Sequence, residues 1–395
     1  MKRDYECRGS VRGNSVLGGS SRIVNEGRVK RLPVPVPFQD LPLAEQLERY
    51  HDKIKLDDEE TKHAEELVSI FIGAIADYVI GRIDSQCNKP PNTKPSRIEY
   101  TGSMYECTKV DRPDEFDIMV VIDGSRELHS EEMIPGYARL LSNNMFYHRF
   151  PKYFDHFYES VTPSEVVNWF YGLVHRGVNE VSKEDWARDP VSLKVSRHGP
   201  AVQVNIKEEG TEVDIAVDLV VCFQLDQQRY YVAKPYKPYA DEPPGVSLSC
   251  NPAVLWRQSF SVIETKTISR LDSSHVSLAN IDGTNECRRE CLRVLKSIFK
   301  KRPTLAKFTS YHLKTVLLHE CRYQGNWQGW KRDERFMDML RRIESCLSDE
   351  HLPHFYLPEL NLLDGIRSET IENMRGRIKH MIDSKSERDR VLYAA

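Results

Sequence analysis

The sequence lacks any long apolar run, and no stretch approaches the roughly 20 residues that a helix needs to cross a bilayer. The first ten residues also lack the apolar core of a secretory signal. The nine cysteines show no framework of short, repeated spacings, which favours reduced thiols over disulfides. These absences argue against a membrane-embedded or secreted protein, so we expect a cytoplasmic chain with no membrane partner.

The sequence also has little net charge, because 56 lysines and arginines oppose 59 aspartates and glutamates. A net charge of -3 does not by itself predict nucleic-acid binding, which usually comes with a basic domain. Basic residues do concentrate in residues 1–31 and again between Arg288 and Arg302. Such clusters are most often solvated tails or helix faces. The second cluster is nevertheless a candidate contact for a nucleic acid.

The length and composition predict a folded protein with two lobes. A chain of 395 residues is too long for one ordinary core, and 40% apolar with 29% charged residues is typical of a globular protein. We predict a basic, disordered arm at residues 1–40, a core domain at 41–245 and a helical domain at 246–395. The arm is rich in Gly, Ser and Arg, and a proline-rich stretch at 233–252 suits the boundary between the lobes.

Hydrophobic periodicity predicts an α+β fold with a mixed sheet. A capping residue at Asp57 precedes apolar residues at helical spacing, which predicts a long helix from about Asp58 to Ile83. Alternating apolar residues predict strands at 115–122, in 191–206 and at 212–223. Helical spacing returns in the C-terminal part of the chain, at 291–301, 311–321 and 335–346.

Two acids open the first of these strands. Alternation along a strand places Glu115 and Asp117 on one face, with Phe116 and Ile118 on the other. Two carboxylates so close oppose joint ionisation unless a cation compensates them. Mg²⁺ takes oxygen ligands and keeps positions open for substrate phosphates, and Mn²⁺ is the alternative. The pair therefore predicts a divalent-metal site for phosphate chemistry.

Other residues of the same kind of site lie before and after this pair. Gly102 and Ser103 can begin a helix whose N-terminus receives a triphosphate. On the strand at 212–223, Asp214 and Asp218 share a face, and alternation cannot choose which of them completes a triad. Each of these pieces alone is common in proteins. Their order, Gly-Ser, then Glu-x-Asp entering an apolar strand, then Asp on a later strand, is far more specific.

These residues lie in runs that closely resemble the catalytic segment of cyclic GMP-AMP synthase (cGAS) and its animal relatives, the cGAS-like receptors. The two main runs are TGSMYE at 101–106 and EFDIMV at 115–120. Further matching runs are spread over residues 45–385 and include GPAV at 199–202, IAVD at 215–218, WRQSFS at 256–261, CLRVLK at 291–296, SYHLKT at 310–315 and PELNL at 358–362. The resemblance implies a two-lobed nucleotidyltransferase fold whose long helix at 58–83 spans both lobes.

The resemblance also implies roles for single residues. It selects Asp218 over Asp214 as the third metal ligand and catalytic acid beside Glu115 and Asp117. Tyr311 would stack on a nucleobase, and Lys296 and Ser310 would hold phosphates. Arg257 would contact the base, as would Ser259 or Ser261, and Gly102 and Ser103 are the other nucleotide contacts that it implies.

A departure from the vertebrate pattern concerns zinc. Vertebrate cGAS carries a zinc-binding insertion with one histidine and three cysteines, whereas the corresponding interval here offers only His275, Cys287 and Cys291. Three candidates fall short of the four ligands of a structural zinc site, so we expect no zinc. That insertion borders DNA in cGAS, and insect-type receptors without it resemble sensors of double-stranded RNA. We therefore favour RNA over DNA as the activator.

The resulting hypothesis is an innate immune sensor. It would join two nucleoside triphosphates, such as ATP and GTP, into a cyclic dinucleotide that acts on a STING-type receptor, and double-stranded nucleic acid would switch it on. The expected nucleic-acid contacts are Lys53, Lys55, Lys62, Arg288, Arg289 and Lys300. Two alternatives stay open: a catalytically inactive scaffold of the male-abnormal-21 type, and an enzyme with a linear product that resembles oligoadenylate synthase.

Overall fold

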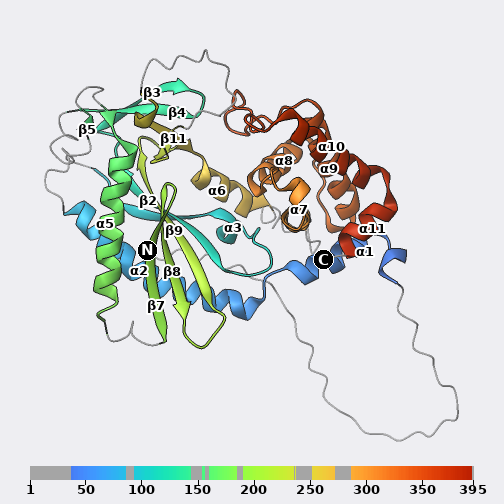
Figure 1. Cartoon of the computed structure of the whole chain (residues 1–395), viewed down its shortest axis with the longest axis horizontal. Helices are drawn as coiled ribbons and strands as arrows, with labels where there is room; N and C mark the ends of the chain where they lie inside the picture. The colour runs from blue at the N-terminus through green and yellow to red at the C-terminus, as the bar shows by residue number, and fades with distance from the viewer. Residues whose placement is uncertain are drawn as a thin grey trace, which may run out of the picture.

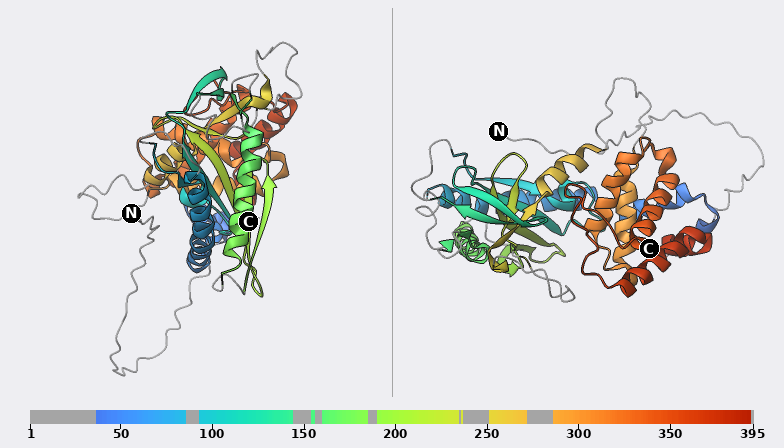
Figure 2. Two further views of the ribbon diagram at one scale, coloured as in Figure 1. Left: turned by 90° about the vertical axis from the view of Figure 1, so that its left-hand side faces the viewer. Right: turned by 90° about the horizontal axis from the view of Figure 1, so that it is seen from above.

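The computed structural model describes residues 37–85, 93–143, 154–155, 160–184, 190–234, 236, 251–271 and 286–393. Two lobes lie side by side, one built on a sheet and one made of helices (Figures 1 and 2), which confirms the predicted two-lobed α+β fold. No helix in these ranges is long and apolar enough to cross a membrane.

The last residues of the predicted arm belong to the fold. Phe38–Asp40 form the 3-10 helix η1, and the ring of Phe38 lies 6.1 Å from that of Tyr393 near the other end of the chain. The prediction of disorder up to residue 40 is therefore wrong for these three residues. Residues 1–36 of the arm, the candidate zinc ligand His275 and most of the predicted boundary stretch lie outside the described ranges.

The described strands form one mixed sheet of eleven strands. The path runs β1-β2-β9-β10-β11-β4-β6-β5, while β3 pairs with β4, and β7 pairs with β8, which pairs with β9. Among the described strands, only the pairing of β2 with β9 is parallel. The strands are β1 (Arg97–Thr101), β2 (Glu115–Asp123), β3 (Leu128–Ile134), β4 (Tyr137–Ser142), β5 (Phe154–Asp155), β6 (Ser160–Val161), β7 (Val191–His198), β8 (Ala201–Glu208), β9 (Asp214–Gln224), β10 (Tyr230–Val232) and β11 (Leu255–Ser259).

The two faces of β2 meet different neighbours. Phe116 and Ile118 are buried in the main core of the sheet lobe, against helices α2 (Asp58–Asp84) and α5 (Pro163–Val181). Val121 on the opposite face packs with Val262 of helix α6 (Ser261–Leu271), which lies toward the helical lobe (Figure 2). Because side chains alternate along a strand, Glu115 and Asp117 belong to this second face. The sheet therefore presents its acids to the space between the lobes.

The helical lobe has its own core. Its helices are α7 (Arg288–Lys300), α8 (Ser310–Tyr323), α9 (Arg332–Ser348), α10 (Ser368–Asp383) and α11 (Lys385–Tyr393). The first helix of the chain, α1 (Leu43–Ile54), joins this lobe, with Leu47 and Tyr50 buried in its core. The chain thus crosses from the helical lobe to the sheet lobe between α1 and α2.

This crossing corrects the predicted helix that spans both lobes. The buried residues of α2 pack in the sheet core and those of α1 in the helical core. The two helices are separate because Lys55 is extended, and the Asp57 side chain caps α2 by accepting hydrogen bonds from the backbone N–H groups of Glu59 and Glu60, both at 3.0 Å. Strand β11 also pairs with the sheet, although it follows the boundary predicted at residue 245.

Candidate active site

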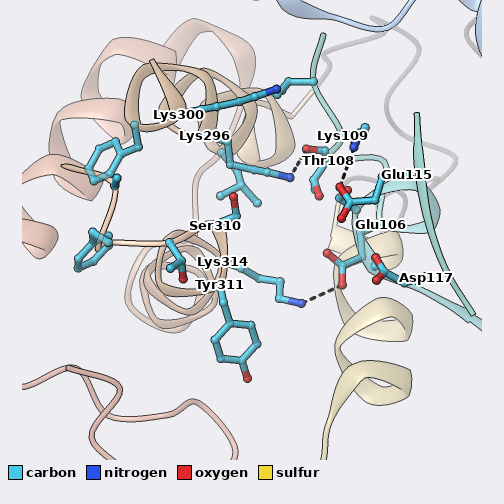
Figure 3. Close-up of a pocket in the computed structure, with 18 residues that line it drawn as sticks. Glu106, Thr108, Lys109, Glu115, Asp117, Lys296, Lys300, Ser310, Tyr311 and Lys314 are labelled. Carbon is cyan, nitrogen blue, oxygen red and sulfur yellow. Dashed lines mark hydrogen bonds and ion pairs between the residues drawn. The ribbon is translucent and has the colours of Figure 1, made fainter. Parts of the chain in front are cut away.

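A cavity of about 540 Å³ lies between the two lobes (Figure 3). Its sheet side comes from the segment between β1 and β2, and its helical side from α7, α8 and the segment between them. The predicted residues among those that line it are Gly102, Ser103, Glu115, Asp117, Lys296, Lys300, Ser310 and Tyr311. Residues more than 190 positions apart in the sequence therefore meet in one cleft.

Gly102 begins the short helix α3 (Gly102–Tyr105) directly after β1 and lies against Asp117. Thr101 and Asp117 are partners in the antiparallel pairing of β1 with β2. The φ angle of Gly102 is 79°, a conformation that side chains disfavour. A Cβ atom at this position would lie 1.9 Å from Oδ2 of Asp117, so only glycine leaves room for the carboxylate.

Asp117 and Asp218 are direct partners in the parallel pairing of β2 with β9. Asp218 accepts a hydrogen bond from Nε2 of Gln203 at 3.0 Å, and Nδ1 of His198 lies 3.9 Å from its other oxygen. Asp214 is exposed at the start of β9 and lines a different pocket. The register thus brings Asp218, rather than Asp214, beside Asp117, although Asp218 does not line the cavity itself.

The environment of these carboxylates opposes negative charge. Burial, then the charges of Glu115, Asp218 and Glu106, raise the pKa of Asp117 to about 6. Burial also raises the pKa of Asp218, despite the hydrogen bond from Gln203. Clustered carboxylate oxygens that resist joint ionisation are the donor set that Mg²⁺ or Mn²⁺ accepts, so the residues fit such an ion.

The acids do not form a closed ligand set in this conformation. Among the described residues, no three His, Cys, Asp or Glu side chains are grouped so that they could hold a metal ion. Glu115 instead contacts Lys109, whose Nζ lies 2.9 Å from its Oε2 and 2.9 Å from Oδ1 of Asp114. Burial lowers the pKa of Lys109, but these two partners outweigh it and the net shift is upward.

The helical wall supplies positive charge. Lys296 projects from α7 and donates a hydrogen bond from Nζ to the backbone oxygen of Thr108 at 2.7 Å (Figure 3). Burial lowers the pKa of this lysine to about 8. Ser310 is the first residue of α8, where free backbone N–H groups favour a phosphate. Both predicted phosphate contacts therefore line the cavity opposite the acids.

Glu106 and Lys314 also line the cavity, and the polar network that joins them to the predicted Tyr311 was not predicted. Nζ of Lys314 lies 3.0 Å from Glu106 and 2.7 Å from Glu264, which ties α8 to the end of α3 and to α6. Tyr311 donates its hydroxyl hydrogen to Glu264 at 2.8 Å and contacts Nε2 of His354 at 2.7 Å. Lys314 follows Ser310 by four positions, so helical spacing is the pattern that would have predicted it on the same face.

Other predicted nucleotide contacts stand apart from the cavity. Arg257 and Ser259 lie on β11 and do not line it, and Ser259 donates a hydrogen bond to Ser261 at 3.2 Å. The two cysteines considered as zinc ligands, Cys287 and Cys291, are buried, and their sulfur atoms lie 3.7 Å from the backbone oxygens of Gln328 and Arg332.

The predicted nucleic-acid contacts separate into two groups. Lys53, Lys55 and Lys62 are exposed along α1, the turn and α2. Arg288 is 8% exposed, forms an ion pair with Glu286 and donates to the backbone oxygen of Leu271 at 2.8 Å. The prediction of Arg288 as a surface contact is therefore wrong, because its guanidinium group is used inside the lobe. Of the two remaining predicted contacts, Arg289 is half-buried, whereas Lys300 is exposed beside the cavity.

Comparison with known families agrees with this architecture. Residues 104–269 match the Mab-21 protein nucleotidyltransferase domain, and residues 287–380 match the Mab-21 protein HhH/H2TH-like domain. The two matches correspond to the two walls of the cleft. Fold and site thus define a protein of the Mab-21 nucleotidyltransferase class.

Individual relatives narrow this class. Cyclic GMP-AMP synthase-like receptor 3 of Stylophora pistillata is 30% identical over 352 residues, which are 86% of this chain and 94% of the relative. Cyclic GMP-AMP synthase of Sus scrofa is 24% identical over 402 residues, with 89% and 76% covered. Mitochondrial dynamics protein MID51 of Danio rerio is 25% identical over 301 residues, with 72% and 59% covered. The chain belongs to the cyclic GMP-AMP synthase-like receptor family, as the resemblance predicted.

Proposed function

We propose that this protein is a metal-dependent nucleotidyltransferase that joins two nucleoside triphosphates, such as ATP and GTP, into a cyclic dinucleotide. In this proposal double-stranded nucleic acid, RNA rather than DNA, activates it in the cytoplasm, and the product acts on a STING-type receptor. The observation that carries the proposal is a single cleft in which Glu115 and Asp117 lie opposite Lys296 and Ser310, with Asp218 paired to Asp117 on the neighbouring strand.

The acid side would hold the metal through Glu115, Asp117 and Asp218. When bound, Mg²⁺ or Mn²⁺ would neutralise phosphate charge and make a hydroxyl a better nucleophile. Asp218 would take up the proton of the attacking ribose hydroxyl. Its carboxylate suits this role because Gln203 fixes one of its oxygens.

The helical side would bind the substrates. Lys296 and the N-terminus of α8 at Ser310 would hold phosphates. Tyr311 would stack on a base, and its hydroxyl group is already fixed by Glu264, which keeps the ring in place. Because Gly102 has no side chain, the Asp117 carboxylate lies close to the start of α3, where the triphosphate would bind.

Activation would act through the connection between α1 and α2. Lys53 and Lys55 flank Ile54, whose backbone oxygen accepts a hydrogen bond from the N–H group of Asp111 at 2.9 Å. Asp111 belongs to the segment that joins α3 to β2. Nucleic-acid phosphates bound by these lysines would shift the population of this segment and of Gly102–Ser103.

The test is a screen with purified full-length protein. It is incubated with the metal ion and the four nucleoside triphosphates, and with duplex RNA, duplex DNA or neither. We expect a product only with the true activator, and none from Asp117→Asn, which should still bind the duplex. A mutant that keeps its activity would contradict the metal assignment, and equal product without duplex would contradict the sensor role.

One relative favours a second candidate. The name of MID51 refers to mitochondrial dynamics and not to nucleotide synthesis. A relative of this chain can therefore carry a name that does not refer to a synthase. A protein without nucleotide turnover would be a scaffold. The acids argue against that alternative here, because Asp117 lines the cleft and Asp218 is its direct partner on β9. The alternative with a linear product needs a separate test. Resistance of the product to phosphatase distinguishes a ring from a linear oligonucleotide.

A further inference from the structure

In the segment between α3 and β2, the side chain of Lys109 places a positive charge on the acid side of the cleft. The ammonium group of Lys109 lies 2.9 Å from both Asp114 and Glu115. The Lys109 side chain is 12% exposed, whereas those of Asp114 and Glu115 are 53% and 56% exposed. The lysine is therefore more buried than the two acids, and Glu115 is already paired with its positive charge, as the dashed line in Figure 3 shows.

Helix α7 holds this segment in place through one of its faces. Arg293 donates to the backbone oxygen of Cys107 at 2.9 Å, Lys296 to that of Thr108 at 2.7 Å, and Lys300 to the carboxylate of Asp111 at 3.0 Å. These three contacts follow the helical repeat and flank Lys109 on both sides.

The backbone of the segment is strained where it is held. Cys107 and Asp111 have φ angles of 55° and 68°, a region that residues other than glycine rarely occupy. Strain of this kind persists only when surrounding contacts over-determine the conformation, and the three basic residues of α7 supply such contacts. The position of Lys109 is thus imposed by the other lobe.

We propose that Lys109 is an internal counter-ion that occupies Glu115 in the nucleotide-free protein and is displaced when this carboxylate binds a divalent cation. The inference rests on the proposed function, in which Glu115 is a metal ligand. Two cations that approach the same carboxylate oxygen repel each other, so the lysine and the metal compete for it. Lys109 therefore lowers the metal affinity of the resting cleft.

The first experiment measures Mn²⁺ binding to the full-length chain by the loss of the free-ion electron paramagnetic resonance signal, without nucleotide or nucleic acid. We expect Lys109→Met to bind about two- to fivefold more tightly than wild type, which is the range for one partly exposed ion pair. Lys109→Arg keeps the charge and should stay near wild type. Lys307→Met is the matched control, because it removes an equal, exposed charge from the segment between α7 and α8 that borders the cavity, and it removes none of the contacts that hold Lys109.

The results separate three outcomes. Equal tightening in Lys109→Met and Lys307→Met would overturn the inference, because it would show only a general effect of charge. Unchanged binding in Lys109→Met, together with lost binding in Asp117→Asn, would also overturn it and leave the metal site intact. Binding that Asp117→Asn does not weaken would instead refute the metal site of the proposed function.

A second experiment needs no variant at this position. Acetylation of lysines in wild-type protein is followed by mass spectrometry with and without saturating Mn²⁺. Displacement predicts that Lys109 is labelled faster when the metal is bound, and that Asp117→Asn shows no such increase. A labelling rate of Lys109 that stays constant while Mn²⁺ binds would overturn the inference.

Discussion

The two walls of the cleft are built in different ways. On the sheet wall, Gly102, Asp117 and Asp218 are placed by strand pairing, and the first two are only 15 positions apart in the sequence. On the helical wall, Lys296 meets its partner Thr108 across 188 positions. Local pattern therefore places Gly102 beside Asp117, long-range strand pairing adds Asp218, and packing of the two lobes determines the basic wall.

The walls also differ in how their charges are compensated. The acid wall raises the pKa of Asp117 and Asp218, since burial and like charge act together there. On the basic wall, Lys314 is enclosed by Glu106 and Glu264, which raise its pKa despite burial. On the acid wall, like charges gather around Asp117. On the basic wall, Lys314 is paired with two carboxylates and so connects the lobes.

The largest expected effect comes from removing Lys314, the lysine that is paired with Glu106 and Glu264. Lys314→Met would leave Glu106 and Glu264 without their cation, and unpaired buried charges cost about 3–5 kcal/mol of unfolding free energy. Chemical denaturation measures the loss. Lys385→Met is the matched control, because it removes an exposed pair with Asp389 and should cost at most about 1 kcal/mol. Equal losses in both variants would show that the Lys314 network does not hold the lobes together.

On the sheet wall, Gly102→Ala tests the close approach to Asp117. The new Cβ atom would overlap the carboxylate and displace it, and a misplacement of this size can reduce turnover about 100-fold. Dinucleotide synthesis measures the effect. Gly210→Ala is the control, because its φ angle of 82° imposes similar strain while nothing lies within 4 Å of its Cβ position. If both variants lose activity equally, strain rather than the contact explains the loss.

The contrast between the walls also explains what the sequence could predict. Alternation and helical spacing predicted β2, β7, β8, β9, α7, α8 and α9. Alternation could not choose between Asp214 and Asp218, because the register of β9 against β2 makes that choice. Lys109 has no recognisable spacing to its partners, and a count of charges cannot show that Arg288 is buried. Such features depend on tertiary packing.

A smaller effect concerns the pH dependence of the basic wall. Burial lowers the pKa of Lys296 to about 8, so its charge is largely lost between pH 7 and pH 9. Nucleotide affinity should fall about tenfold over this range if the charge binds phosphate, because about one lysine in ten stays protonated at pH 9. Equilibrium binding of a non-hydrolysable triphosphate measures this fall. Lys296→Met should bind weakly at every pH, and the same decline in that variant would contradict the assignment.

The stability of the free protein should change in the opposite direction. The folded pKa of Lys296, about 8, lies below the ordinary pKa of 10.5 for a lysine in an unfolded chain. Between these values the unfolded chain binds more protons than the folded chain. The contribution of Lys296 to unfolding free energy therefore rises as pH increases from 8 to 10.5. Denaturation of wild type and Lys296→Met across this range should show the difference, and parallel curves would contradict the burial of a charged amine.

The smallest expected effect compares exposed with buried basic residues on the outer surface of the molecule. Lys53→Ala and Lys55→Ala should each reduce the slope of log affinity against log salt concentration by about one, if each lysine neutralises one duplex phosphate. Fluorescence anisotropy with duplex RNA at several salt concentrations measures the slope. Arg288→Met should leave it unchanged and lower only stability, because the arginine is bound to Glu286 and Leu271. An altered slope in Arg288→Met, with unaltered slopes in both lysine variants, would place the duplex on α7 rather than beside the α1–α2 connection.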